Sequence, residues 1–288
     1  MKLSTRTLIG IISALIFATN LFGQAQITTK KEKIKNFPTA TTEIVLTGDE
    51  LFDNVLQDCI SSSWSVSPYE FCTKEQFEAL KTNPGLYFLV PVQGQFRKES
   101  EPGITLLTLV KGGVAADKNI GDMMELTSFP LKAADAPFGR EMAFLPVIIR
   151  FIQDQVMEKV GSELKAYSSG ISIKPKTFAK LWNKQIYFSE EDISPQVNTE
   201  VISSLDPDIF FDEDNTEIFE NGDYNAVVSF VVAPLEPQKG SICYKMLIGA
   251  DTHEIYYFKK HQITASNGAG FLNSDMKAIT GVRKKNKR

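Results

Sequence analysis

The sequence predicts a mixed α/β protein made of two tandem units, each a mixed sheet with packed helices. Two observations support this fold class. The pattern of apolar and polar residues at 43–62 recurs at 185–204, and a slightly shifted register aligns Pro91 with Pro234 and Ile104 with Ile242. In each copy, runs of β-forming residues and helical patterns follow one another in the order β-α-β-α-β-β-β-α. This order indicates one fold that is used twice.

In the first copy, strands are predicted where short apolar runs lie between polar turns, and helices where apolar residues recur every three to four positions. Thr73 followed by Gln76 has the capping-box pattern, so a short helix should begin there. Pro146 should interrupt or kink the closing helix. The expected strands are 44–46, 69–72, 86–92, 104–110 and 123–129, and the closing helix is 140–165.

The second copy is interpreted in the same way. Ser189 precedes three acidic residues, which favours a helix start because carboxylates stabilise the positive end of the helix dipole. Asp212 should cap the next helix, and the turn at 250–253 should join two strands in a hairpin. The expected strands are 186–188, 209–211, 224–233, 242–248 and 254–263, and the closing helix is 272–280.

The first 25 residues have the features of an export signal. Lys2 and Arg6 precede an apolar run at 8–17 that is too short to span a bilayer, and small residues follow up to Ala25. No later run reaches the roughly 18 apolar residues of a membrane helix, so we expect a protein that is soluble after cleavage, in the periplasm or outside the cell. The expected organisation is a signal peptide (1–25), a linker (26–42), the first unit (43–166), a linker (167–177), the second unit (178–281) and a basic tail (282–288).

The composition is that of a globular protein with an acidic surface. Hydrophobic residues make up 43% of the chain and charged residues 23%, and the net charge is -4. Without residues 1–25, 29 basic residues stand against 35 acidic ones, a net charge of -6. An acidic chain does not favour nucleic acid as a partner. The basic runs at 30–35 and 283–288 are interpreted as solvated tails.

The chain has three cysteines, Cys59, Cys72 and Cys243, which cannot all pair within one molecule. The first interpretation is that they are small hydrophobic residues of the core. A disulfide between Cys59 and Cys72 is the alternative that an oxidising, exported compartment would permit. A reactive thiol is the third interpretation, although no histidine has a context that marks it as a partner.

No motif indicates catalysis, a cofactor or a metal. The acidic run that includes Asp212 and Asp214 suggests a calcium loop, but Glu217 stands where an EF-hand turn needs glycine. His253 begins like a zinc-protease motif, yet Tyr257 replaces the second histidine ligand. We therefore predict no catalytic residue, no cofactor and no metal ligand.

Three consecutive aromatic residues, Tyr256, Tyr257 and Phe258, fall on one predicted strand of the second copy. Because side chains alternate along a strand, they place aromatic rings on both faces of the sheet. One face of this strand is therefore a candidate contact surface, since aromatic residues are enriched in protein interfaces.

The stretches 223–229 and 242–255 together resemble a segment of the TolB amino-terminal and CsgG-like domains of the bacterial envelope. The resemblance covers part of the second copy and, more loosely, the first, and His253 stands where those domains usually have a turn glycine. It implies a periplasmic or outer-membrane-associated module that assembles with other proteins and is not an enzyme. A shared fold does not by itself fix a function.

These observations together predict an exported, non-catalytic envelope protein that acts through protein–protein contacts, with an envelope protein as its partner. The rival hypothesis is a binder of small molecules or glycans, or a hydrolase, with its site between the two copies, because ligand pockets favour such junctions. A deep cleft with converging carboxylates or aromatic rings would favour the rival. A shallow junction would favour protein binding.

Overall fold

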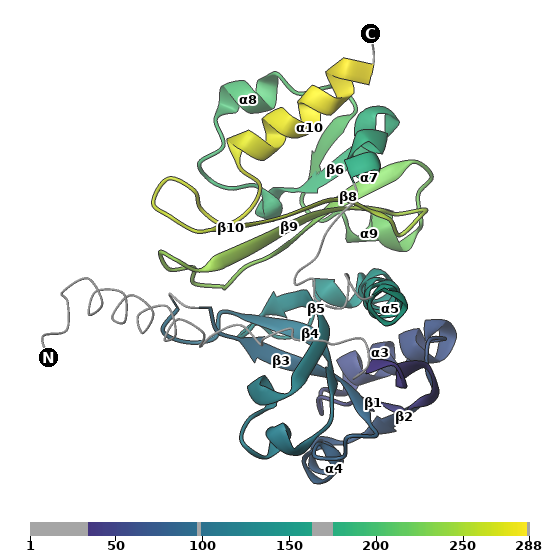
Figure 1. Cartoon of the computed structure of the whole chain (residues 1–288). Helices are drawn as coiled ribbons and strands as arrows, with labels where there is room; N and C mark the ends of the chain where they lie inside the picture. Colours follow the sequence, from purple (N-terminus) through teal and green to yellow (C-terminus); the bar gives the residue numbers. More distant parts are fainter. Residues whose placement is uncertain (1–33, 97–98, 163–174, 287–288) are drawn as a thin grey trace, which may run out of the picture.

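Figure 1 shows a computed structural model of the chain, which forms two stacked α/β modules. The structure describes residues 34–96, 99–162 and 175–286, so the predicted export signal at 1–25 lies outside the described residues. The first module comprises the described residues up to 162, and the second comprises 175–286. None of the helices in these described ranges is both long and apolar enough to cross a membrane.

The first module contains a five-stranded sheet with the strand order β2-β1-β3-β4-β5. β1 pairs in parallel with β2 and β3, whereas β4 runs antiparallel to both β3 and β5. The strands are β1 (Thr42–Val45), β2 (Tyr69–Cys72), β3 (Tyr87–Gly94), β4 (Ile104–Lys111) and β5 (Met124–Ala133). The helices are α3 (Glu50–Ser63), α4 (Lys74–Leu80) and α5 (Leu145–Gly161), with short 3-10 turns η1 (Phe37–Thr39), η2 (Val114–Asp117), η3 (Ile120–Asp122) and η4 (Arg140–Met142).

The second module has the strand order β10-β9-β8-β6-β7 with the same pattern of parallel and antiparallel pairs. Its strands are β6 (Gln185–Ser189), β7 (Ile209–Asp212), β8 (Ala226–Val232), β9 (Ile242–Gly249) and β10 (Ile255–Gln262). Its helices are α7 (Pro175–Ala179), α8 (Thr199–Ser203), α9 (Thr216–Glu220) and α10 (Asn273–Asn286), with 3-10 turns η5 (Lys180–Asn183) and η6 (Glu190–Asp192). The predicted mixed α/β class and the repeated order of elements are confirmed.

The helices cover equivalent faces of the two sheets. In the first module, Phe52 of α3 and Ile148 of α5 pack on one face of the sheet, and Phe77 of α4 packs on the other. In the second module, α8 and α10 lie on one face and α9 on the other, as Ile279 and Phe219 show. The helix after the first strand and the closing helix therefore share a face in both modules.

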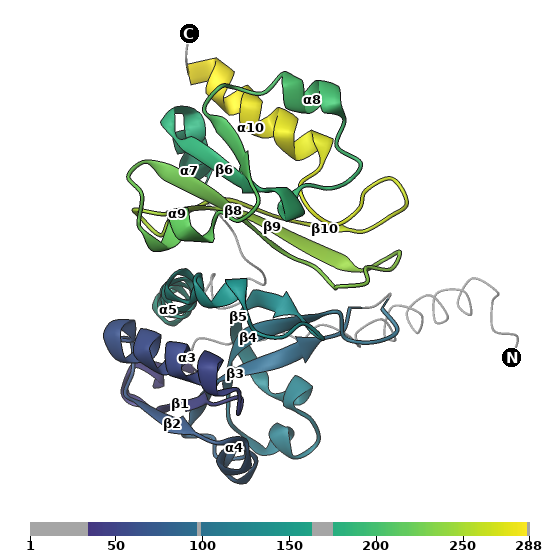
Figure 2. The same ribbon diagram turned by 180° about the vertical axis from the view of Figure 1, so that it is seen from behind.

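The two modules stack head to tail and share one hydrophobic core. The face of the first sheet that carries α3 and α5 lies against the face of the second sheet that carries α9 (Figures 1 and 2). Val228 and Phe230 of β8 point into this shared core, whereas Val227, just before them, points to the opposite face, as strand alternation requires. Phe144 lies just before α5. Its ring centroid is 4.6 Å from that of Phe219 and 4.4 Å from that of Phe230.

Helix starts show where local sequence rules applied and where they failed. Thr73 forms the predicted capping box with Gln76. The closing helix of the first module begins at Leu145, with Pro146 in its first turn, where the missing N–H costs no helical hydrogen bond.

The predicted helix start at Ser189 is wrong: its hydroxyl donates to the carbonyl of Glu213, and a single 3-10 turn follows. Pro195 disfavours a helical residue before it, and α8 begins only after this proline.

Two further helix boundaries differ from the predictions. Asp212 ends strand β7 and does not cap α9, whose N-cap position is occupied by Asn215. The side chain of Asn215 donates to the carbonyl oxygens of Tyr187 on β6 and Ser229 on β8, so it links these two strands. The closing helix α10 extends to Asn286, beyond its predicted end, because Arg283 makes buried contacts on its inner side.

Candidate functional site at the junction of the modules

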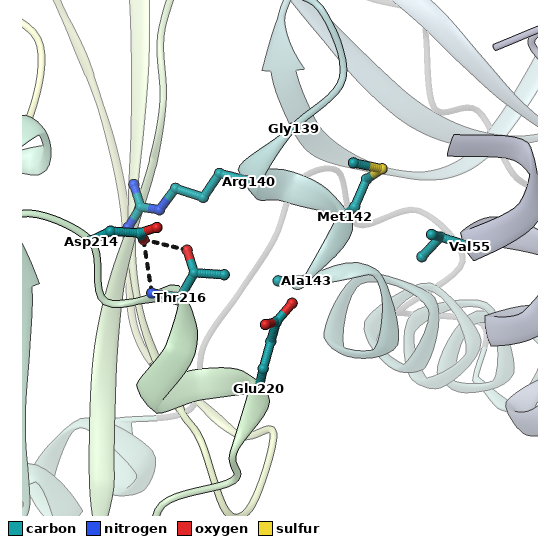
Figure 3. Close-up of a pocket in the computed structure, with 8 residues that line it drawn as sticks. All are labelled: Val55, Gly139, Arg140, Met142, Ala143, Asp214, Thr216 and Glu220. Carbon is teal, nitrogen blue, oxygen red and sulfur yellow. Dashed lines mark hydrogen bonds between the residues drawn. The ribbon is translucent and has the colours of Figure 1, made fainter. Parts of the chain in front are cut away.

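An open hollow of about 420 Å³ lies where the two modules meet, and we call it the junction hollow. The first module contributes an aliphatic wall, and the second contributes oxygen atoms, as the labelled side chains in Figure 3 show. The residues that line it are Val55, Gly139, Arg140, Met142, Ala143, Asp214, Thr216 and Glu220.

Arg140 reaches from the first module into the second, beside this hollow. Its guanidinium forms a bidentate pair with Asp192, with N···O distances of 3.0 and 2.9 Å, and also lies 2.8 Å from Glu191. The same group donates to the side chain of Asn215 at 2.7 Å and to the backbone carbonyl of Ser229 at 2.9 Å. Burial lowers the pKa of Arg140, but the adjacent Asp192 outweighs this effect, and the net shift is upward. Arg140 therefore stays charged, and its ion pair and hydrogen bonds link the first module to the second.

The carboxylate of Asp192 is held in place by the second sheet. The Ser229 hydroxyl donates to it at 2.5 Å and accepts from the backbone N–H of Ser189 at 2.9 Å. Such buried polar groups are stable only when their hydrogen bonds are made. Within this cluster, Nε of Arg140 departs from the rule, because it is buried and has no hydrogen-bond partner among the described residues.

The two carboxylates of the junction hollow have different surroundings. Asp214 accepts hydrogen bonds from the backbone N–H and the hydroxyl of Thr216, at 2.9 and 2.5 Å. These bonds lower the pKa of Asp214, so it remains ionised in mildly acidic solution. Glu220 is the last residue of α9 and is exposed. Its carboxylate is therefore available to a group from outside the chain.

The chemistry that these lining residues can perform is limited. They include no histidine, cysteine or lysine, and the hydroxyl of Thr216 is already engaged by Asp214. The positive charge of Arg140 is matched by Asp192. What remains is an aliphatic wall facing two carboxylates, an arrangement suited to binding.

The cysteines lie in the interior, as their first interpretation expected. All three are buried and free. Cys59 on α3 packs in the shared core, whereas Cys72 of β2 packs with α4 on the opposite face of the first sheet. The sheet separates the two sulfur atoms, so the alternative Cys59–Cys72 disulfide is not formed. Burial raises the pKa of Cys59 to about 11 and that of Cys72 to about 12, which opposes the reactive-thiol interpretation.

The aromatic residues of β10 are not an exposed contact surface, which corrects that interpretation. Tyr256 is 1% exposed and Tyr257 is 8% exposed, and both pack in the core beneath α10. Phe258 on the other face lies 6.3 Å from Phe129 of the first module, measured between ring centroids. The two aromatic faces arise because β10 is covered on both sides within the chain.

The histidines and the acidic run are separated in the structure. His253 stacks on Phe219 from a turn, whereas His261 lies on β10 and forms a hydrogen bond with the carbonyl of Gly268 in the loop that follows. Asp212 ends β7, while Asp214 lines the junction hollow. Within the described ranges, no three residues of the types His, Cys, Asp and Glu converge as metal ligands would.

A second buried ionic cluster lies on the outer face of the second sheet. Lys245 of β9 forms a completely buried ion pair with Asp275 of α10. Asp275 also accepts hydrogen bonds from the Tyr257 hydroxyl at 2.6 Å, from Lys259 at 3.0 Å and from the backbone N–H of Leu272 at 2.8 Å. Burial tends to raise the pKa of Asp275, but the bonds from Lys245 and Tyr257 hold it at about 2. This cluster fixes α10 on the sheet.

Sequence reasoning missed the Arg140 cluster. The available signal was the acidic triplet Glu190–Asp192, which was assigned to a helix start. A single arginine 50 residues upstream gave no local pattern that could link it to these carboxylates.

Comparisons of the chain with protein-family models, curated proteins and solved structures found no match.

Proposed function

We propose that this chain is an exported, non-catalytic protein of the bacterial envelope that acts by binding another protein, with the junction hollow as its contact site. The observation that carries the proposal is the form of the junction. The modules meet through a packed core around Phe144, and the hollow beside it is open and has an aliphatic wall opposite carboxylates. Interfaces are typically built from such an apolar centre with polar groups at its rim.

Two features of the sequence support the location and the type of partner. The predicted signal at 1–25 has a basic start, a short apolar run and small residues for cleavage. The resemblance of 223–229 and 242–255 to TolB amino-terminal and CsgG-like domains suggests an envelope module that assembles with other proteins. The hollow is open and none of the described residues that line it is aromatic, so the rival glycan or hydrolase site receives no specific support.

Export is tested by mass spectrometry of the protein from the envelope fraction. We expect the mature chain to begin after Gly23 or Ala25. A chain in that fraction that still begins at Met1 would contradict the export proposal.

The contact site is tested with a photo-crosslinking amino acid at Ala143, which lines the junction hollow. The matched control places the same amino acid at Lys277, an exposed residue of α10 on the far face of the second sheet. We expect a discrete crosslinked partner band from position 143 in living cells and none from position 277. Equal crosslinking from both positions, or none from either, would oppose a specific contact at the hollow.

A further inference from the structure

The junction hollow has a strong local excess of negative charge. Among the described residues, Arg140 is the only basic one that lines it, and four carboxylates lie in or directly beside the hollow. These are Glu191, Asp192, Asp214 and Glu220, so one positive charge stands against four negative ones, a local net charge of -3. Complementary charge is a major source of specificity at protein interfaces. The hollow is therefore matched to a cationic group.

The positive charge of Arg140 cannot serve an external anion. Both terminal nitrogens of its guanidinium are directed to Asp192, Glu191, Asn215 and the carbonyl of Ser229 within the second module. In contrast, no ion pair or hydrogen bond engages the carboxylate of Glu220 within the ranges that the structure describes. Asp214 is kept ionised by its hydrogen bonds from Thr216. The charged groups of the hollow that remain available to a ligand are therefore carboxylates, which are negative.

The opposite wall of the hollow is aliphatic. Val55 on α3, Met142 on η4 and Ala143 present carbon atoms opposite the carboxylates (Figure 3). A ligand that fits must combine an apolar stem with a positively charged end. Lysine and arginine side chains have this form, because their methylene stems pack on apolar surface while the charged head stays near water or an acceptor.

We infer that the junction hollow binds a lysine or arginine side chain from a basic segment of a partner protein. The stem packs on Val55 and Met142, and the cationic head pairs with Glu220 and Asp214. The volume of about 420 Å³ lies near the lower end of the range for ligand pockets, which is enough for one long side chain and too small for a folded element. This inference rests on the proposed function, because it assigns the chemistry of the partner at the same site.

The test is a titration of the mature chain with a fluorescent, end-capped decapeptide of alternating lysine and glycine, followed by anisotropy at low salt. Glu220→Gln should weaken binding about fivefold, as expected for the loss of one partly exposed ion pair. Glu217→Gln is the matched control, because it makes the same change on an exposed residue of the same helix that does not line the hollow. It should change the dissociation constant by less than about twofold.

Two further measurements keep the inference falsifiable. Val55→Thr keeps the side-chain shape but adds a hydroxyl to the aliphatic wall, and it should also weaken peptide binding while the melting temperature identifies any loss of fold. Equal losses for Glu220→Gln and Glu217→Gln, or equal binding of a glutamate–glycine peptide, would overturn the inference. Tighter binding of spermidine with the same dependence on Glu220 would instead assign the hollow to small polyamines and overturn the assignment to a protein segment.

Crosslinking separates this inference from the proposed function. If the partner band from position 143 persists when Glu220 is changed to Gln, the hollow contacts a partner but not through a cation. If the band weakens with Glu220→Gln and not with Glu217→Gln, both the proposed function and the inference of a cationic side chain are supported. If no band forms in the unchanged protein, the proposed function fails, whatever the peptide titration gives.

Discussion

Arg140 of the first module and Asp192 of the second form a bidentate ion pair across the junction, with N···O distances of 3.0 and 2.9 Å. The side chain of Asp192 is only 3% exposed and that of Arg140 17% exposed, so the pair is shielded from water. Their separation in sequence is 52 residues. The pair therefore links two modules that each have their own sheet and helices.

Breaking this pair should destabilise the protein. Asp192→Asn leaves Arg140 charged and without its main partner, so we expect the free energy of unfolding to fall by about 2–4 kcal/mol. Urea denaturation measures the change. In the double variant with Arg140→Ala the loss should be smaller than the sum of the two single losses, because the two residues act on one interaction.

Arg150→Ala is the matched control for this prediction. Arg150 lies 4.0 Å from Asp154 on the surface of α5, and both side chains are more than half exposed. Its guanidinium also donates to the backbone carbonyl of Thr252 in the second module at 3.0 Å, so it is an exposed contact between the modules. Its loss should change the unfolding free energy by less than about 1 kcal/mol. A similar effect of Arg140 and Arg150 substitutions would contradict a special role for the junction pair.

The two modules should unfold as one unit because they share a core. The chain has two tryptophans, Trp64 in the first module and Trp182 in the second. Trp182→Phe leaves fluorescence that reports on the first module, and Trp64→Phe leaves fluorescence that reports on the second. We expect each reporter, compared with circular dichroism of the same variant, to give the same denaturation midpoint. Separate midpoints within one variant would show that the modules are independent.

Phe144 should be essential to this shared core. It is fully buried and its ring contacts Phe219 and Phe230 of the other module. Phe144→Ala should lower the unfolding free energy by about 3–5 kcal/mol, as large aromatic deletions in a core do. Phe77→Ala, in the small core beneath α4, should also destabilise the first module but leave the contact between modules in place. Only the Phe144 variant should separate the midpoints seen by the two tryptophans.

The Asp275 cluster makes stability depend on pH in the acidic range. The folded pKa of Asp275 is about 2, below the unfolded value of about 3.9, so its contribution is present above about pH 4 and is lost as the pH falls through 2. Asp275→Asn should cost about 2–3 kcal/mol or more at neutral pH. The difference between the two proteins should shrink from pH 4 downward. A difference in stability between the two proteins that stays constant from neutral pH to pH 2 would contradict this explanation.

The cysteines should remain reduced and unreactive in the folded protein. Burial holds the pKa of Cys243, like that of Cys59, at about 11, so little thiolate exists near pH 8. Ellman's reagent should react slowly with the native chain and should detect all three thiols after unfolding in denaturant without reductant. Detection of a single thiol in the unfolded, unreduced protein would reveal a disulfide that this structure does not contain.

The stacking of the modules has two different ends. Leu107 of β4 packs in the shared core, whereas Lys245 of β9 lies on the corresponding face of the second sheet and pairs with Asp275 of α10. The corresponding faces of the two sheets therefore have different surroundings, because the first contacts the second module and the second holds a buried ion pair beneath α10.

The sequence by itself determined the architecture of each module. Hydrophobic periodicity and turn residues predicted the β-α-β-α-β-β-β-α order in both copies. The predicted register of Pro91 with Pro234 is wrong, because Pro91 lies inside β3 and pairs with Leu107, whereas Pro234 lies beyond the end of β8 at Val232. The capping box at Thr73 was also predictable, because the two side chains that form it are three residues apart. Such features depend on neighbours along the chain, which a sequence displays directly.

Only the tertiary structure decided how the modules meet and where the candidate site lies. Nothing near Arg140 in the chain indicates that it would reach Asp192, and the burial of Tyr256 and Tyr257 depends on α10, which follows them in sequence. The same is true of Cys59 and Cys72, which a sheet separates although they are only 13 positions apart. These relationships arise from tertiary packing within and between the modules, which follows no local periodicity of the sequence.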